Sequence, residues 1–185
     1  MTASVPAIRV LLVDPTLTVR ELLQEYLRGR GMAVTAVETV AAARVAWTTE
    51  RYDVVVCETA LPDGEALQVF AQFRDFGCGL LAIAGSLSVP NAIATLRAGA
   101  EDILLKPLRL REVYDAVRGA AVRGRLRERE RLARGILIGA ARCQSLTEAT
   151  ALRAILSAEA DLFAEDAVLQ EACTRVVALA EQEHS

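Results

Sequence analysis

The chain has 185 residues, a net charge of −3 and 53% hydrophobic residues, which suits one packed domain with an appendage. Aromatic residues contribute only 4%, so the core must be aliphatic. The single His184 and four cysteines without CxxC spacing exclude histidine-based acid–base chemistry and offer no metal set. Uncharged apolar runs fall well short of the roughly 20 residues that span a bilayer, and no secretion signal precedes them. We therefore expect a cytoplasmic protein without a membrane span.

The first two-thirds of the chain alternate strand and helix patterns. Short apolar runs predict strands at Ile8–Val13, Ala33–Val37, Val54–Cys57, Leu80–Ala84 and Ile103–Leu105. Helical spacing predicts helices at Thr16–Arg30, Val40–Glu50, from the Leu61–Gly64 turn to Phe73, and at Pro90–Ala98. A further helix begins after Pro107. This alternation predicts an α/β fold with a five-stranded, doubly wound parallel sheet, whose functional site lies at the carboxyl ends of the strands.

The pattern becomes helical throughout after Pro107. Apolar residues recur every three or four positions from Leu110 to Ala120, but Arg127 and Arg131 continue the same face, so a sustained coiled coil is not predicted. Ser145–Glu148 resembles a helix start with a capping box. We expect three parts: a first domain at 1–119, a long Arg-rich linker helix at 120–143 that continues its last helix, and a small acidic, all-α unit at 144–185.

The charge is unevenly distributed along this helical part. Residues 118–134 carry seven Arg and two Glu, a net charge of +5, whereas residues 135–185 carry three Arg and eight acidic residues, a net charge of −5. The densest basic stretch, called the basic patch below, consists of Arg123, Arg125, Arg127, Arg129 and Arg131. A solvated helix face explains it more simply than a nucleic-acid surface.

Three charged residues end or come directly after alternate predicted strands. Asp14 closes the first strand, Glu58 closes the third, and Lys106 comes after the fifth, immediately before Pro107. The carboxyl ends of parallel strands meet at one edge of a sheet. We therefore expect two carboxylates and one ammonium to converge there, with an ion pair between Glu58 and Lys106.

The segments around these residues resemble the response-regulator receiver family of bacteria. The resemblance rests on LLVDP at Leu11–Pro15, YDVVVCETALPDG at Tyr52–Gly64 and RAGAEDILLKP at Arg97–Pro107, and it covers about residues 7–120. It implies a flavodoxin-like receiver of two-component or phosphorelay signalling, with a cis Lys106-Pro107 peptide bond. The family's chemistry is phosphoryl transfer to an aspartate, assisted by Mg²⁺, a hydroxyl group and the lysine.

Four positions depart from the residues that this chemistry requires. Pro15 stands at the main metal-binding carboxylate beside Asp14, and Glu58 stands at the phosphoacceptor. Ala84 replaces the hydroxyl residue, and Ile103 replaces the aromatic residue that normally reports phosphorylation. Together these changes predict a pseudo-receiver that binds no metal, needs no cofactor and is not an enzyme. Glu58 then either holds one fixed signalling state or is a remnant that only stabilises the fold.

Two classes of function are compatible with these features. The first is a protein-interaction module that binds a protein partner or itself as a homodimer, through the fourth helix, fifth strand and fifth helix of the receiver. The alternative is an RNA-binding antiterminator, because Ala133–Ile138 and Leu146–Ala149 resemble elements of the ANTAR family. The spacing is longer than in that family and the acidic carboxyl-terminal part repels phosphate, so we rank protein interaction first.

Overall fold

The computed structural model describes residues 7–86, 88–142 and 174. The chain divides into two compact units, Met1–Leu126 and Arg127–Ser185, and helix α5 (Leu110–Arg142) spans the division. Apart from Thr174, the predicted acidic unit at 144–185 lies outside the described residues, and so does the segment Leu146–Ala149. Within the part of the chain that is described, no helix combines the length and apolarity that a membrane crossing requires.

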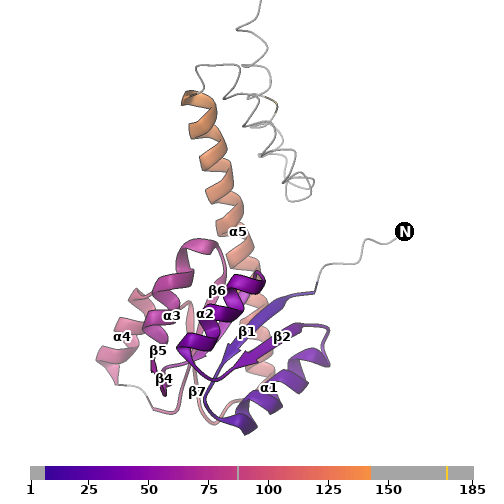
Figure 1. Ribbon diagram of the computed structural model, residues 1–185, viewed down its shortest axis with the longest axis vertical. Coiled ribbons are helices and arrows are strands. Elements are labelled where there is room, and N and C mark those ends of the chain that lie inside the picture. The colour runs from indigo at the N-terminus through magenta and orange to yellow at the C-terminus, as the bar shows by residue number, and fades with distance from the viewer. Residues whose placement is uncertain (1–6, 87, 143–173, 175–185) are drawn as a thin grey trace, which may run out of the picture. The chain divides into compact units, whose positions relative to one another are not determined.

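The predicted five-stranded parallel sheet is confirmed (Figure 1). Its strands are β1 (Arg9–Val13), β2 (Ala33–Val37), β3 (Val54–Glu58), β6 (Gly79–Ala84) and β7 (Asp102–Leu105). They pair in the order β2-β1-β3-β6-β7, and every pair is parallel. The central strands β3 and β6 are buried at every position, as their continuous apolar sequence predicts for strands that are covered on both faces.

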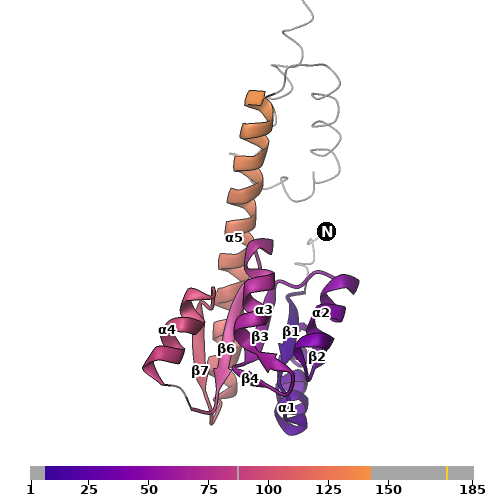
Figure 2. The same ribbon diagram turned by 60° about the vertical axis from the view of Figure 1, so that its left-hand side comes forward.

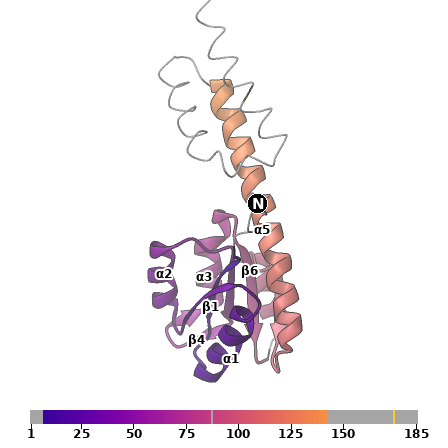
Figure 3. The same cartoon turned by 90° about the vertical axis from the view of Figure 1, so that its right-hand side faces the viewer.

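Helices cover both faces of this sheet. They are α1 (Leu17–Arg28), α2 (Val40–Thr49), α3 (Ala66–Phe73), the 3₁₀ turn η1 (Arg74–Phe76), α4 (Val89–Arg97) and α5. In Figure 3, α5 runs along one face and α2 and α3 lie on the other. Alternate strand residues divide between the two layers: Val55 and Cys57 pack with α2 and α3, whereas Val54 and Val56 pack with α1 and α5.

The segment after β3 differs from the predicted simple turn. It forms a two-stranded antiparallel ribbon of β4 (Ala60–Leu61) and β5 (Gly64–Glu65) before α3 begins. Its turn residue Asp63 accepts hydrogen bonds from the backbone N–H groups of Val40 (2.8 Å) and Ala41 (2.9 Å). These two N–H groups lie in the first turn of α2, where no intrahelical acceptor is available. Asp63 therefore caps the amino terminus of a helix that begins more than twenty residues before it in the sequence.

Substituting Asp63 with alanine is expected to lower the melting temperature at neutral pH. The hydrogen bonds from Ala41 and Val40 hold the pKa of Asp63 below its usual value of 3.8. A carboxyl whose folded-state pKa is lowered stabilises the fold above its unfolded pKa and loses that contribution as the pH falls through its folded pKa. Thermal unfolding of both proteins at pH 7 and at pH values below 3.8 measures the difference between their melting temperatures. A difference that does not become smaller in acid would contradict the role of the ionised Asp63 carboxylate.

Candidate functional site

The sheet register aligns the strand ends that carry the predicted charges. Val13 of β1 pairs with Cys57 of β3, so Asp14 and Glu58 come next on adjacent strands. On the other side of β3, Glu58 pairs with Ile83 of β6, and Ala84 pairs with Leu105 of β7. Lys106 is the next residue, and its N–H donates to the carbonyl oxygen of Ala84 (2.8 Å). The sheet therefore brings three charged residues to its carboxyl edge.

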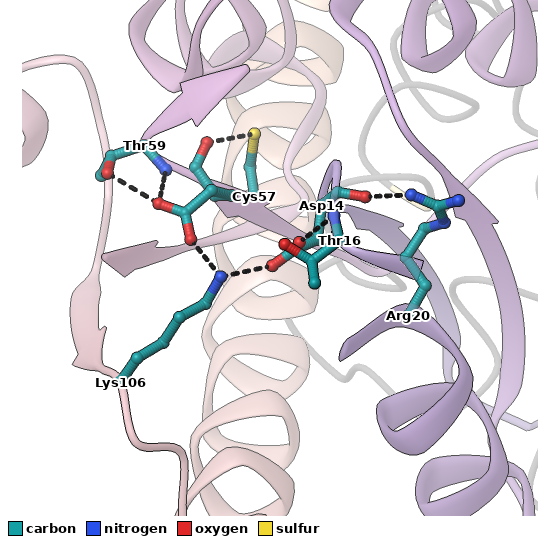
Figure 4. Close-up of polar contacts among 7 residues, drawn as sticks. Asp14, Thr16, Arg20, Cys57, Thr59 and Lys106 are labelled. Carbon is teal, nitrogen blue, oxygen red and sulfur yellow. Dashed lines mark hydrogen bonds and ion pairs between the residues drawn. The ribbon is translucent and has the colours of Figure 1, made fainter. Parts of the chain in front are cut away.

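Lys106 bridges the two carboxylates at this edge. Its Nζ lies 2.9 Å from Asp14 Oδ2 and 2.5 Å from Glu58 Oε2. In Figure 4 the lysine side chain extends from its loop toward Asp14. The Asp14 carboxylate is completely buried and Glu58 is 7% exposed, whereas the lysine side chain is 25% exposed. Buried carboxylates need a partner of opposite charge, and here one ammonium serves both.

The remaining carboxylate oxygens are also hydrogen-bonded. Glu58 Oε1 accepts from both the backbone N–H and the hydroxyl group of Thr59, each at 2.9 Å. Asp14 Oδ1 accepts from the backbone N–H of Thr16 (2.8 Å). Arg20 donates to the carbonyl oxygen of Asp14 (2.7 Å) (Figure 4). Sequence reasoning missed Thr59, Thr16 and Arg20, although Thr59 and Thr16 stand one and two residues after the charged positions.

The hydrogen bonds of Lys106 favour its charged form. Partial burial lowers the pKa of Lys106, but the hydrogen bonds to Glu58 and Asp14 outweigh burial and raise this pKa above the usual lysine value. The ammonium is therefore the form that is present at neutral pH. Asp14 and Glu58 are therefore both paired with the charged ammonium of Lys106.

The other predicted positions lie around this cluster. Pro15 comes directly after Asp14 and is half-buried, and Ala84 is completely buried at the end of β6. Ile103 of β7 is half-buried and packs against the layer formed by α2 and α3. The Lys106-Pro107 peptide bond is cis.

This donor set does not fit the magnesium ion of receiver chemistry. Mg²⁺ requires oxygen ligands in nearly octahedral geometry and is usually held by carboxylates. Here Pro15 offers no side-chain oxygen, and the ammonium of Lys106 binds both Asp14 and Glu58. Among the described residues, no group of three or more His, Cys, Asp and Glu could hold a metal ion.

The basic patch lies on α5, away from these residues in the sequence. Arg123 and Arg125 bind Glu101 and Asp53, respectively, which precede strands of the sheet. Arg131 binds Glu128 within the helix. Arg127 also has an interaction partner, and Arg129 is half-buried. Arg123, Arg125 and Arg131 are therefore paired with carboxylates of this chain.

The fold and the position of the charged site define a signalling receiver domain. The family model described as the response regulator receiver domain matches residues 10–118. Because that match covers more than half of the chain, the chain belongs to the response regulator receiver domain family. This match ends at residue 118, so it gives no support to the predicted resemblance of the carboxyl-terminal helices to ANTAR domains.

Curated relatives are bacterial response regulators. The chain is 29% identical over 112 residues to the KDP operon transcriptional regulatory protein KdpE of Escherichia coli (strain K12), covering 60% of this chain and 50% of that protein. It is 32% identical over 126 residues to the response regulator MprA of Mycobacterium ulcerans (strain Agy99), covering 67% and 54%. The chain thus spans about half the length of these relatives.

A solved structure supports the same fold. The CheY-like response regulator receiver domain protein of Methanospirillum hungatei JF-1 superimposes with a TM-score of 0.61 at 20% identity, covering 64% of this chain and 97% of that one. At this identity the likeness concerns the fold alone.

Proposed function

We propose that this chain is a phosphorylation-independent receiver that signals in the cytoplasm through protein contacts. The observation that carries the proposal is the ammonium of Lys106, which binds both Asp14 and Glu58. Pro15 and Ala84 add neither a metal ligand nor a hydrogen bond to phosphate. With these groups missing, phosphoryl transfer lacks its cation and one of its phosphate contacts.

In this proposal Glu58 holds the receiver in one fixed state. Its carboxylate places a permanent negative charge at the phosphoacceptor position, and Lys106 and Thr59 restrain both of its oxygens. The output of the domain then depends on which surface it presents, because no phosphate changes that surface. We further propose that residues 1–119 are the receiver, 120–143 the connecting helix and 144–185 a separate acidic unit.

The contact surface that we propose lies on α4 and the edge strand β7. Four large apolar side chains there are exposed: Val89 (73%), Ile93 (45%), Leu96 (49%) and Leu105 (59%). Figure 2 shows both elements at the left-hand side of the domain. Single exposed apolar residues are ordinary, but a group of them indicates an interaction surface. Receivers commonly use this face for contacts, and we propose a second copy of the chain as the partner.

Substituting Ile93 or Leu105 with aspartate is expected to reduce self-association. Each change places a charge in an apolar contact, where it is costly to desolvate. Size-exclusion chromatography with light scattering on the full chain measures the mass, which should fall from dimer to monomer. The matched control is Val45→Asp on α2, because Val45 is also exposed (64%) but lies on another helix. A monomeric wild type, or equal effects of all three variants, would contradict the proposed surface.

The RNA-binding alternative predicts a different ligand for the basic patch. Two arginines of this patch, Arg123 and Arg125, bind carboxylates of the receiver, which counts against a surface open to phosphate. If RNA were the ligand, wild-type protein would bind structured RNA with an affinity that falls steeply as the salt concentration rises. Such binding would favour the alternative while leaving the loss of phosphorylation chemistry intact.

A further inference from the structure

The basic patch is the sequence feature that the proposed function leaves unused. Arg123 and Arg125 flank Gly124 on α5. Arg123 Nε donates to Glu101 Oε2 (2.5 Å), and Arg125 Nε donates to Asp53 Oδ1 (3.0 Å). Asp53 directly precedes β3 and Glu101 directly precedes β7. Both carboxylates therefore lie at the amino-terminal edge of the sheet, opposite the edge that carries Lys106.

The backbones approach closely between these two ion pairs. Gly124 is buried, and a Cβ atom added to it would lie 2.5 Å from the carbonyl oxygen of Gly77 and 2.8 Å from the nitrogen of Gly79. A Cβ atom on Gly79 would in turn lie 2.6 Å from the Cβ of Ala120. None of these three distances is tolerable for a real side chain, so α5 can pack on this turn only because both positions are glycine.

Asp53 connects the helix to more than one strand. Its Oδ2 accepts from the backbone N–H of Arg9 at the start of β1 (2.8 Å), while Oδ1 accepts from Arg125. Its carbonyl oxygen accepts from the N–H of Gly79 at the start of β6 (2.8 Å). The carboxylates are shielded, since the side chains of Asp53 and Glu101 are only 22% and 11% exposed.

We propose that Arg123-Gly124-Arg125 is an intramolecular latch. The two arginines recognise the carboxylates of Glu101 and Asp53 in the same chain, and the glycine lets the helix backbone seat on the Gly77–Gly79 turn. The latch holds residues 119–126 of α5 against the sheet edge opposite Lys106. It thus makes this part of α5 a rigid continuation of the receiver rather than a basic arm that is free to bind a polyanion. This goes beyond the proposed function, because the latch can hold or fail whether or not the chain self-associates.

The ion pairs are tested by a charge swap in the full chain, with amide hydrogen exchange of residues 119–126 as the readout. Glu101→Arg and Arg123→Glu should each speed exchange roughly threefold to tenfold, because each replaces an attraction by a repulsion. The double variant Glu101→Arg/Arg123→Glu should restore exchange to about the wild-type rate, since the attraction returns with reversed sign. The control is Arg109→Glu, which breaks the exposed Arg109–Glu112 pair at the start of α5 and should leave the exchange rates of residues 119–126 unchanged.

A double variant that exchanges as fast as the single variants would overturn the latch. So would single variants that match the Arg109→Glu control. Binding of structured RNA by wild type that Arg123→Glu abolishes would also overturn it, because this arginine would then serve an external ligand.

The glycine contact is tested by a matched pair of substitutions. Gly124→Ala should lower the melting temperature by roughly 5 °C or more and speed exchange of residues 119–126, because the new methyl group meets backbone atoms. Gly135→Ala is the control, since a Cβ atom on this exposed glycine of α5 would meet nothing within 4 Å and alanine favours the helix. Equal melting temperatures for the two variants would show that α5 does not depend on the close contact.

Discussion

Replacing Lys106 with alanine is expected to lower the free energy of unfolding by about 3 kcal/mol, because it removes one partner of a buried ion cluster. The carboxylate of Asp14 is completely buried and that of Glu58 nearly so, and Lys106 is the ammonium that binds both. Without it, two like charges face each other across a site from which water is largely excluded. Urea unfolding of the full chain at pH 7 measures the loss.

The matched control is Arg109→Ala, which removes a cation from the exposed Arg109–Glu112 pair. Exposed pairs of this kind contribute at most about 1 kcal/mol, so this variant should stay close to wild type. A Lys106→Ala variant as stable as Arg109→Ala would show that the Lys106 ammonium does not stabilise the fold through Asp14 and Glu58.

The Lys106 contribution depends on pH through the raised pKa of this lysine. A lysine whose folded-state pKa is raised stabilises the fold fully below its unfolded pKa and loses that contribution as the pH rises through the folded pKa. The usual lysine value is 10.5. The stability gap between wild type and Lys106→Ala should therefore stay constant in neutral and mildly alkaline solution and narrow only above that value.

The sheet and its charged edge were accessible to sequence reasoning because they depend on short-range patterns. Strands buried on both faces leave continuous apolar runs such as Val54–Cys57, and in a parallel sheet the residues after such runs lie at one edge. That rule was sufficient to predict that Asp14, Glu58 and Lys106 lie close together. It did not show that one ammonium binds both carboxylates, because that depends on side-chain conformations.

Two other contacts between distant segments were not predicted. The capping of α2 by Asp63 joins residues 23 positions apart, and the Arg125–Asp53 pair joins residues 72 positions apart. Neither pair leaves a local pattern. The sequence therefore presented Asp63 as an ordinary turn residue and Arg125 as part of a solvated face, whereas both bind within the fold.

Restoring phosphorylation should require three substitutions together. The variant Pro15→Asp/Glu58→Asp/Ala84→Thr returns a second metal-binding carboxylate, an acceptor of the right length and a hydroxyl group, while Lys106 is already present. We expect it to take up phosphate from acetyl phosphate in the presence of Mg²⁺. Glu58→Asp alone is the control and should stay inactive, because Pro15 and Ala84 still lack the ligand and the hydroxyl group. Uptake by the single variant equal to that of the triple variant would show that these two positions do not matter.

The most direct measurement is phosphate incorporation by the wild-type chain. The purified chain of 185 residues is incubated with acetyl phosphate with and without Mg²⁺, and incorporated phosphate is quantified by intact mass and by phosphate-affinity electrophoresis. A receiver with an intact site, tested in parallel, shows that the donor is active. We expect no Mg²⁺-dependent phosphate on this chain. Stable incorporation at Glu58, Asp14 or any other carboxylate that depends on Mg²⁺ would contradict the loss of phosphorylation chemistry.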